Sequence, residues 1–581
     1  MSGKKFRNRR HQQGYANRVP VMSSSDLILP NLDLTSIQDE RARECVRQLF
    51  NLVETLMADL RDARAENQRL RDEVNRLKGE QGKPDIKPDR PASPGTRGQH
   101  SSEGERHEPK DWHKRSKLDR IPIDREIVLK LDPASLPPDA EFKGYEPVVV
   151  QDLRIATDNI KFMKGKYYSA SAGKTYLAPL PNGYAGEFGP GVKSLSIVFA
   201  NGCNMTEPKI AEWFANMGIS ISAGQISNLL TGRQEKFHAE KAAIVQAGLA
   251  SSPWQHIDDT GTRVDGQNRH CQVLCNPLYT GYFTTERKDR LTVIDVLRNL
   301  RERVFLMNEE AFGFIRQFGL PVRVIEGLRN VPRDQNMGEA EFRCWLDAHI
   351  PLLGPQQQSR ILEAAAVAAY HAEVEYPVIR LLLCDDAPQF KLVTEELALC
   401  WIHDGRHYKK LEPCVPHHRY LLDSFLKQYW EFYKQLLAFR QTPTPEHAVH
   451  LSDTFDCLFS TVTGYDALDA RIAKTEAKKS HLLMVLRHPE IPLHNNAAEL
   501  AARQRVRKRA VSFGPRSEKG IKAWDTFHTL CSTAKKLGVS IYRYIHDRVS
   551  EANQMLSLAE LIAQRAAQLN LGSSWDSSSA L

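Results

Sequence analysis

Three acidic residues of this chain have the types and sequence settings of a two-metal site for phosphoryl transfer. Asp258 ends the run Trp-Gln-His-Ile-Asp, and Asp385 ends the run Val-Ile-Arg-Leu-Leu-Leu-Cys-Asp. Glu499 lies in His-Asn-Asn-Ala-Ala-Glu, just before a dense basic stretch. Carboxylate oxygens are the ligands that hard divalent cations prefer. Two such cations about 3.5–4 Å apart can activate a nucleophile and stabilise the leaving oxygen of the reaction.

Each aspartate has an acidic neighbour, Asp259 in one case and Asp386 in the other. Because successive side chains of a strand point to opposite faces, only one member of each pair can face a shared site. We predict that Asp258 and Asp385 do so, since an apolar run ends on each of them. One such pair taken alone is more often a turn or a helix cap, so the hypothesis depends on the three acids together.

The region after Glu499 is strongly basic, in a chain of 581 residues with a formal net charge of +8. Residues 501–523 contain one acid and eight basic residues, which are Arg503, Arg505, Arg507, Lys508, Arg509, Arg516, Lys519 and Lys522. On a helix, Glu499, Arg503 and Arg507 lie four residues apart and share one face. That face is either a row of surface salt bridges or a phosphate-binding surface. A second basic run at 1–20 favours nucleic acid. We therefore predict that DNA is contacted by Arg503, Arg507, Lys508 and Arg509.

Other enzyme classes lack motif support. The sequence contains no Gly-x-x-x-x-Gly-Lys-Ser/Thr string of a nucleoside triphosphatase and no Gly-x-Ser-x-Gly elbow of a serine hydrolase. Cys400-Trp-Ile-His403 is the best transition-metal candidate, but a buried thiol near a satisfied histidine is the commoner arrangement, and zinc is not expected.

The ten cysteines form no Cys-x-x-Cys pair, and no apolar run approaches the length of a membrane span. We expect a cytoplasmic protein without a membrane partner.

Strand and helix signals around the acids predict an RNase H-like α/β core within a multidomain α+β chain. Strands are expected at 254–258, 270–275, 279–284, 378–384 and 397–402. Helices are expected at 290–301 and between the fourth and fifth strands. Asp258 would then end the first strand and Asp385 the fourth, while Glu499 would lie on a helix packed against the sheet.

A helix-turn-helix is predicted at 206–231, upstream of this core. Gly218 separates two helices with apolar faces, and Ser222 can cap the second of them. In a helix-turn-helix the second helix contacts bases, so Gln225 and Asn228 are candidate DNA-binding residues. An ordinary helical hairpin has the same pattern, and that alternative stays open.

A heptad repeat at 38–80 predicts a parallel coiled-coil dimer. Its two rows are Val46, Val53, Leu60, Asn67, Val74 and Leu49, Leu56, Ala63, Leu70, Leu77. A single buried asparagine tends to fix the register of such a seam. We expect pairing through Leu49, Leu56, Leu60, Asn67, Leu70 and Leu77. The alternative is one amphipathic helix that packs on its own domain.

Composition divides the remainder of the chain. Residues 1–37 are predicted to be a basic disordered tail, 81–120 a linker and 566–581 a second tail. The folded segments expected between them are a small β-containing domain at 121–204 with strands at 126–131 and 148–156, the helix-turn-helix region at 205–250, the core at 251–411 with a helical insertion at 305–374, a second helical insertion at 412–490, and the Glu499 helix with further helices at 491–565.

The sequence resembles the DDE transposases of the bacterial insertion-sequence sixty-six family, the TnpC class. The matching strings are His256-Ile-Asp-Asp-Thr-Gly, Cys384-Asp-Asp-Ala-Pro-Gln-Phe, Cys400-Trp-Ile-His, His494-Asn-Asn-Ala-Ala-Glu, Arg507-Lys-Arg, Phe513-Gly, Thr533-Ala-Lys-Lys-Leu-Gly-Val and Tyr542-Arg-Tyr-Ile. The chain departs from the family at Asp259, where a glutamate is usual. It also lacks cysteines in 79–200, where the family often carries a zinc-binding segment.

The resemblance implies that Asp258, Asp385 and Glu499 are catalytic residues and metal ligands. It implies two Mg²⁺ ions, with Mn²⁺ as a substitute. The partners it implies are a second protomer, the terminal inverted repeats of a mobile element, target DNA and accessory proteins of that element. Two other functions stay open, namely a catalytically inactive DNA-binding dimer that acts as a regulator, and a metal-dependent nuclease without strand transfer.

Overall fold

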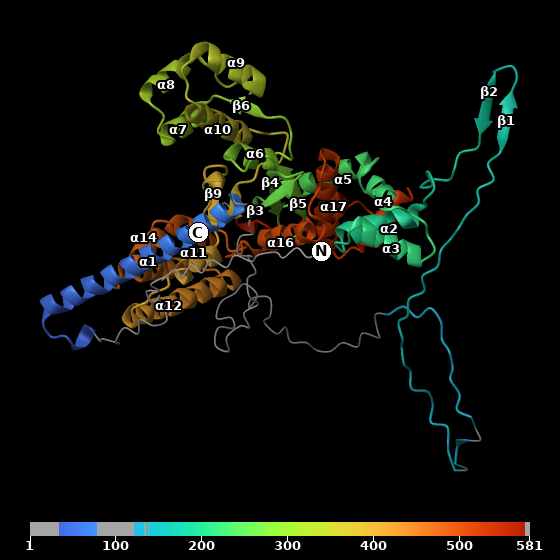
Figure 1. The fold of residues 1–581 in the computed structure, drawn as a ribbon, viewed down its shortest axis with the longest axis horizontal. Coiled ribbons are helices and arrows are strands. Elements are labelled where there is room, and N and C mark those ends of the chain that lie inside the picture. Colours follow the sequence, from blue (N-terminus) through green and yellow to red (C-terminus); the bar gives the residue numbers. More distant parts are fainter. Residues whose placement is uncertain (1–33, 78–120, 133–134, 138, 576–581) are drawn as a thin grey trace, which may run out of the picture. The chain divides into compact units, whose positions relative to one another are not determined.

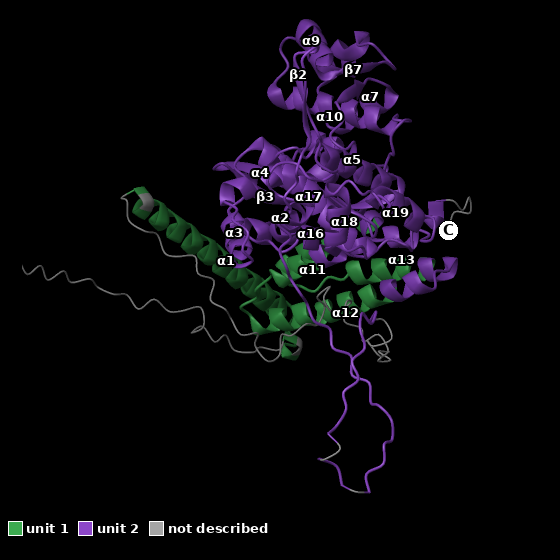
Figure 2. Ribbon diagram, turned by 90° about the vertical axis from the view of Figure 1, so that its right-hand side faces the viewer, with its two compact units in different colours: residues 1–91, 404–435, 449–479 green, residues 92–403, 436–448, 480–581 purple. Residues whose placement is uncertain are grey.

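The structure is a computed structural model that describes residues 34–77, 121–132, 135–137 and 139–575. The predicted linker and most of the predicted N-terminal tail lie outside these residues. The chain forms two compact units (Figure 2). Of the described residues, unit 1 contains 34–77, 404–435 and 449–479, and unit 2 contains those of 121–403, together with 436–448 and 480–575. Among the described helices, none has both the length and the apolar character needed to cross a bilayer.

A five-stranded mixed sheet lies at the centre of unit 2 (Figure 1). In spatial order its strands are β5 (Thr280–Thr285), β4 (Gln267–Cys275), β3 (Trp254–Val264), β8 (Leu381–Cys384) and β9 (Glu396–Leu399). The pairs β3–β4 and β4–β5 are antiparallel, whereas β3–β8 and β8–β9 are parallel. Asp265 and Gly266 turn β3 into β4 with positive φ angles of 47° and 77°, as a type I′ turn requires. All five predicted strands are therefore present, with shifted ends. The prediction that Asp258 ends the first strand is wrong, because β3 continues to Val264 before the chain turns, whereas Asp385 directly follows β8.

The prediction of a helix between the fourth and fifth strands is wrong. The only helical element between β8 and β9 is the single 3-10 turn η5 (Pro388–Phe390). Leu392 has a positive φ of 63°, a conformation that no α-helix contains. The connection therefore crosses from one parallel strand to the next without a full helix.

Helices cover the sheet. On one face α16 (Asn496–Ser512) packs on β3 and β4, and α17 (Glu518–Leu537) packs on β5. The core beneath α16 joins Val273 and Tyr282 of the sheet to Ala498, Ala501 and Ala502 of the helix. Alanine side chains let the helix approach the strands closely, which holds the first turn of α16 near the sheet.

The segment 305–374 is mostly helical, as predicted. Its helices are α7 (Glu309–Gln317), α8 (Val322–Gly327), α9 (Glu339–His349) and α10 (Pro355–His371), and it follows α6 (Arg290–Leu297). One feature was not predicted. Two short strands, β6 (Val304–Leu306) and β7 (Asn336–Gly338), pair antiparallel within it.

Residues 121–204 do not form the predicted β-containing domain. The chain at 126–131 and 148–156 has no regular secondary structure, and nearly all its side chains are exposed. The strands that form in the described part of this segment are β1 (Lys166–Ser169) and β2 (Lys174–Leu177), an exposed two-stranded hairpin. A polar–apolar alternation forms a strand only where a partner strand or a core is available, and these segments have neither.

The two helices predicted at 206–231 are present, within a group of four helices. Its elements are α2 (Pro190–Asn201), α3 (Glu207–Asn216), α4 (Ala223–Thr231) and α5 (Glu235–Ala250). Gly218 turns the chain after α3 with a φ of 78°. Ser222 caps α4 through a capping box with Gln225. Ile210, Phe214 and Ile226 form the buried apolar faces of the two helices.

Part of the predicted C-terminal tail is ordered. Residues Ser573–Trp575 form a 3-10 helix beyond α19 (Leu558–Ala566). The Trp575 ring stacks on His488 with 4.2 Å between ring centroids. Ser574 Oγ lies 2.7 Å from Nδ1 of the same histidine. The prediction of disorder is thus wrong for 566–575, and residues 576–581 lie outside the described part of the chain.

Unit 1 is helical, as predicted for 412–490. It contains α1 (Glu40–Leu77), α14 (Asp466–Glu476), and most of α11 (Trp401–Lys409), α12 (Pro416–Gln441) and α13 (Pro445–Phe459). α1 packs in this unit through Glu54, whose carboxylate accepts the backbone N–H groups of Cys414 and Val415 at 2.8–3.0 Å. Burial opposes ionisation of Glu54, but bonds from His418 and these N–H groups hold its pKa at about 2.

The heptad seam of α1 is largely exposed. Eight of its ten residues are solvent-exposed, whereas Val46 and Val53 are half-buried. Leu56 and Leu70 each expose 58% of their surface. Packing within unit 1 therefore uses a different face of the helix from the one that carries the heptad rows.

Candidate active site

The pairing of β3 with β8 sets Asp258 beside Asp385. Trp254 pairs with Leu381, and the same offset (381 − 254 = 127) continues through the ladder. Asp258 and Asp385 differ by the same number (385 − 258 = 127), so continuing the register matches the two aspartates. Neighbouring strands lie about 4.8 Å apart. Matched residues of parallel strands also point to the same face, so both carboxylates are directed to one side of the sheet.

That side is the one covered by α16. Asp258 pairs with Val273 of β4, and Val273 packs against the alanines of α16. Glu499 lies in the first turn of the same helix. The structure thus brings together all three acids predicted from sequence, although they come from two strands and a helix that are distant along the chain.

Asn495 fixes the start of α16 to β3. Its Nδ2 donates to the carbonyl of Ile257 at 2.7 Å, and its Oδ1 lies 2.9 Å from Nδ1 of His256. Asn495 is fully buried. Burial lowers the pKa of His256 to about 3, so this histidine is neutral and the contact is a hydrogen bond between neutral groups. This positioning role of Asn495 was not predicted from the sequence.

The electrostatics of Asp258 reflect the crowding of acids. Burial raises its pKa, and the charges of Asp385 and Glu499 raise it further, to about 7. A hydrogen bond from the N–H of Asp259, 2.9 Å from Oδ1, only partly opposes these effects. Three carboxylates held this close repel one another, and a bound cation would relieve that repulsion.

This pKa predicts how stability depends on pH. The unfolded state loses the Asp258 proton near 3.8 and the folded state near 7, so Asp258 destabilises the metal-free fold increasingly as pH rises between those values. Asp258→Asn should therefore gain stability relative to the parent over this range, by up to about 4 kcal/mol. Urea unfolding of both proteins between pH 4 and 8, without divalent metal, measures the gain. A difference that stays constant with pH would contradict it.

The neighbouring acids point elsewhere. Asp259 pairs with Gln272 of β4, on the opposite face of the sheet. Its carboxylate accepts from Gln389 Nε2 at 2.8 Å and from Lys288 Nζ at 3.3 Å. Asp386 forms an ion pair with Lys391 at 2.9 Å. Asp258 and Asp385 are therefore the members of each pair that share a face with Glu499.

Cys400 and His403 also lie at this site. The Sγ atom of Cys400 accepts the N–H of Asn495 at 3.2 Å, and His403 Nδ1 lies 3.5 Å from Glu499 Oε1. Burial raises the pKa of the Cys400 thiol to about 12, so a metal ion would have to displace its proton. The sequence identified this Cys-x-x-His motif but gave no signal that it lies next to Glu499, which is 96 residues away (499 − 403).

The basic residues of α16 divide into two groups. Arg503 and Arg507 are both exposed on α16. Arg509 is half-buried and donates to the carbonyl of Gly261. Lys508 is 3% exposed, and its ammonium bonds the carbonyls of Ala200 and Met205. Burial lowers the pKa of Lys508 to about 8. The prediction that Lys508 contacts DNA is therefore corrected to a structural role.

The two residues of α4 that were predicted to contact DNA have different surroundings. Asn228 is exposed on α4. Gln225 Oε1 instead accepts the N–H of Ser222 at 3.0 Å, and its Nε2 donates to Glu187 at 3.3 Å. These bonds engage both ends of the Gln225 amide in capping and local packing. Reading a base with this side chain would require the capping box to open.

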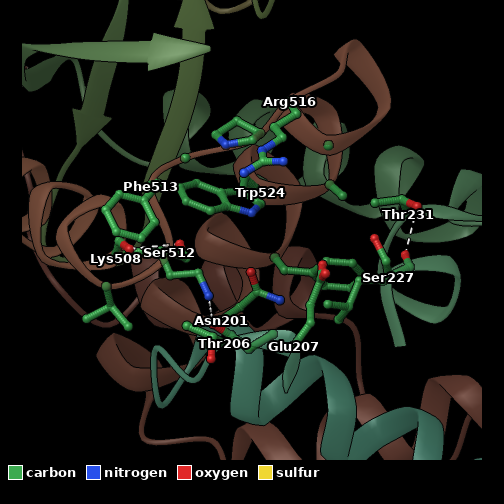
Figure 3. Close-up of a pocket in the computed structure, with 18 of the residues that line it drawn as sticks. Asn201, Thr206, Glu207, Ser227, Thr231, Lys508, Ser512, Phe513, Arg516 and Trp524 are labelled. Carbon is green, nitrogen blue, oxygen red and sulfur yellow. Dashed lines mark hydrogen bonds between the residues drawn. The ribbon is translucent and has the colours of Figure 1, made fainter. Parts of the chain in front are cut away.

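A cavity of about 530 Å³ lies where this helical region meets α16 and α17 (Figure 3). Polar residues from both sides line it, among them Asn201, Glu207, Ser227, Thr231, Lys508, Ser512, Arg516 and Trp524. Asp258, Asp385 and Glu499 are not among its lining residues. The cavity is therefore separate from the cluster of acids.

Comparison with known proteins gives one informative result. No family model matches the chain. The uncharacterized protein y4jO of Sinorhizobium fredii (strain NBRC 101917 / NGR234) is 31% identical over 327 residues, which are 56% of this chain and 100% of that protein. The similarity extends over the whole relative, and its name states no activity.

Proposed function

This chain belongs to one family with the Sinorhizobium fredii protein y4jO, and we propose that it is a DNA transposase that uses a DDE site. The observation that carries the proposal is the convergence of Asp258, Asp385 and Glu499 on one face of the sheet. The strand order β5-β4-β3-β8-β9, antiparallel and then parallel, agrees with the order expected of an RNase H-like core. The resemblance of the surrounding strings to the insertion-sequence sixty-six family supports the same conclusion.

The donor set fits Mg²⁺. Asp258, Asp385 and Glu499 provide only oxygen donors. The pKa of Asp258 is raised first by burial and then by the charges of Asp385 and Glu499, and a cation would offset those charges. These three residues would hold two ions. When bound, such ions activate the attacking oxygen and neutralise charge on the phosphate. Asn495 keeps Glu499 in place by tying the start of α16 to β3.

The proposed reaction has two phosphoryl transfers. In the first, water attacks a phosphodiester at an element end, breaking the P–O3′ bond to give a 3′-hydroxyl and a 5′-phosphate. In the second, that 3′-hydroxyl attacks a target phosphodiester and forms a new O3′–P bond. The target strand leaves with its own 3′-hydroxyl, so the number of phosphodiester bonds is conserved in this second step. The protein contributes positioning of the reactants and stabilisation of charge.

A strand-transfer assay tests the function. Labelled DNA carrying an element end is incubated with the full chain and Mg²⁺, together with an unlabelled target plasmid. Cleavage at the 3′ end followed by joining to the plasmid is the expected result. Cleavage without joining would replace the proposal with the nuclease alternative. Tight binding with neither reaction would replace it with the regulator alternative.

The surface arginines of α16 should bind phosphate. Replacing both Arg503 and Arg507 by alanine should weaken binding to every DNA sequence alike, because phosphate contacts carry no base information. The slope of log affinity against log salt should fall by about 1 for each phosphate that the variant no longer neutralises. Fluorescence anisotropy with duplexes of two unrelated sequences over a salt series measures both effects. The control is Arg323→Ala, an exposed arginine on α8; an unchanged slope in the double variant would contradict phosphate binding by this helix.

The exposed heptad seam should pair two copies of the chain. Its sustained seven-residue spacing and its one asparagine fit a second, parallel copy of α1. The parent should sediment as a dimer at micromolar concentration without DNA. Leu56→Glu with Leu70→Glu should give monomers, because charge would enter the seam. Ala58→Glu, at an exposed position outside both rows, is the control; a monomeric parent would contradict the pairing role.

A further inference from the structure

A second set of donor atoms meets the acid cluster at Glu499. One ligand atom from each of Cys400, His403 and Glu499 lies within 4.8 Å of the other two. His403 Nδ1 and Glu499 Oε1 lie 3.5 Å apart. In a tetrahedral zinc site with bonds of about 2.0–2.3 Å, ligand atoms lie roughly 3.3–3.8 Å apart. Small side-chain rotations would therefore bring the three atoms to bonding distance of one ion.

The chemistry of this set differs from that of the acids on the sheet. Sulfur and imidazole ligands suit zinc, whereas Mg²⁺ prefers oxygen. Cys400 is 2% exposed, and the backbone N–H of Asn495 is directed at its sulfur. Cys400 and His403 are three residues apart at the start of α11, so they can face the same ion. Three protein ligands leave a fourth position for water or substrate.

We propose that Cys400, His403 and Glu499 form a Zn²⁺ site, and that zinc bound there competes with Mg²⁺ for Glu499. The zinc site stands on its own geometry. The competition rests on the proposed function, in which Glu499 belongs to the oxygen-only set with Asp258 and Asp385. If zinc holds the Glu499 carboxylate beside Cys400 and His403, that carboxylate cannot bind Mg²⁺ together with the two aspartates. Zinc would therefore inhibit the Mg²⁺-dependent reaction.

Cobalt binding tests the site without any assay of activity. Co²⁺ replaces Zn²⁺ at such sites, and a cysteine ligand produces a sulfur-to-cobalt charge-transfer band in the near ultraviolet. The full chain, stripped of metal, should bind one Co²⁺ with this band and release it when Zn²⁺ is added. Cys400→Ser should abolish the band, and His403→Gln should weaken binding at least about tenfold. A parent without the band, or Cys400→Ser with it, would overturn the proposal.

Two controls separate this site from its surroundings. Cys384→Ser removes a second buried thiol that lies one strand away, and Asp258→Asn removes an acid of the sheet. Both variants should keep the band. Its loss in Cys384→Ser would show that the sulfur ligand is Cys384 and not Cys400. In Cys400→Ser the hydroxyl oxygen can accept the same hydrogen bond from the N–H of Asn495. Thermal melts show whether each variant is folded. His403→Gln gives an independent answer if Cys400→Ser is unfolded.

The competition is tested in the strand-transfer assay at fixed Mg²⁺. Zinc should inhibit the parent, and His403→Gln should be less sensitive to zinc when compared with its own zinc-free rate. Equal sensitivity, or stimulation of the parent by zinc, would overturn the competition. A parent that shows the cobalt band but no Mg²⁺-dependent reaction would refute the proposed function while leaving the zinc site intact.

Discussion

Replacing any one of Asp258, Asp385 and Glu499 by its amide should reduce cleavage and joining by at least about 10³-fold. The amide keeps the size of the side chain but removes the charge that would hold a divalent cation. In the proposed function all three acids act on the same phosphate. Their effects should therefore not add, and Asp258→Asn with Asp385→Asn should be no worse than either alone. Rates of 3′-end cleavage in Mg²⁺ measure this, with DNA affinity followed in parallel by anisotropy.

The neighbouring acids are matched controls for this prediction. Asp259→Asn and Asp386→Asn make the same chemical change one residue away, on side chains engaged by Gln389 and Lys391. Both variants should keep cleavage within about tenfold of the parent, since neither side chain faces the proposed metal site. If Asp259→Asn were inactive while Asp258→Asn cleaved normally, the strand face assigned to the site would be wrong. Retained DNA binding in the inactive variants would show that the affected step is chemical.

Breaking the ion pair beneath α16 should lower the free energy of unfolding by about 3–5 kcal/mol. Arg505 is 2% exposed, and its Nη2 donates to Asp525 at 2.6 Å and to Thr284 Oγ1 at 2.7 Å. Asp525 also accepts the N–H of Thr284 at 2.7 Å. The cluster therefore joins α16, α17 and β5. Arg505→Met would leave a buried carboxylate without its cation, which urea unfolding followed by circular dichroism should detect.

Two comparisons make the result specific. Arg503→Met, an exposed arginine two residues away on the same helix, should change stability by no more than about 0.5 kcal/mol. Arg505→Met combined with Asp525→Leu should recover part of the stability, because no unpaired buried charge remains. Equal effects of Arg503→Met and Arg505→Met would contradict the assignment of one arginine to structure and the other to the surface.

The sequence by itself was sufficient for the features that depend on local patterns. The apolar runs that end on Asp258 and Asp385 predicted both strands, and the turn between β3 and β4 is formed by a local Asp265-Gly266 pair. The cap at Ser222 and the break at Gly218 predicted α3 and α4. These signals are local, since strand alternation, turn chemistry and capping bonds act between residues a few positions apart.

Local patterns failed where a partner was required. The segments at 126–131 and 148–156 have the composition of strands, but no strand among the described residues pairs with them, and they stay irregular. Residues 566–575 of the predicted tail are ordered, because the Trp575 ring stacks on the ring of His488, which is distant in the sequence. Whether such a segment becomes ordered depends on contacts that its own residues do not specify.

The residues of the candidate site could be predicted from the sequence, but the tertiary structure decided how they come together. Residue type and spacing identified Asp258, Asp385 and Glu499, but only the register of β3 with β8 and the packing of α16 decided which carboxylates share a face. The same packing buried Lys508, left Arg503 exposed and set His403 beside Glu499. The direction and the burial of a side chain depend on how segments that are distant along the chain pack together. That packing is fixed only when the whole sheet and its helices are in place.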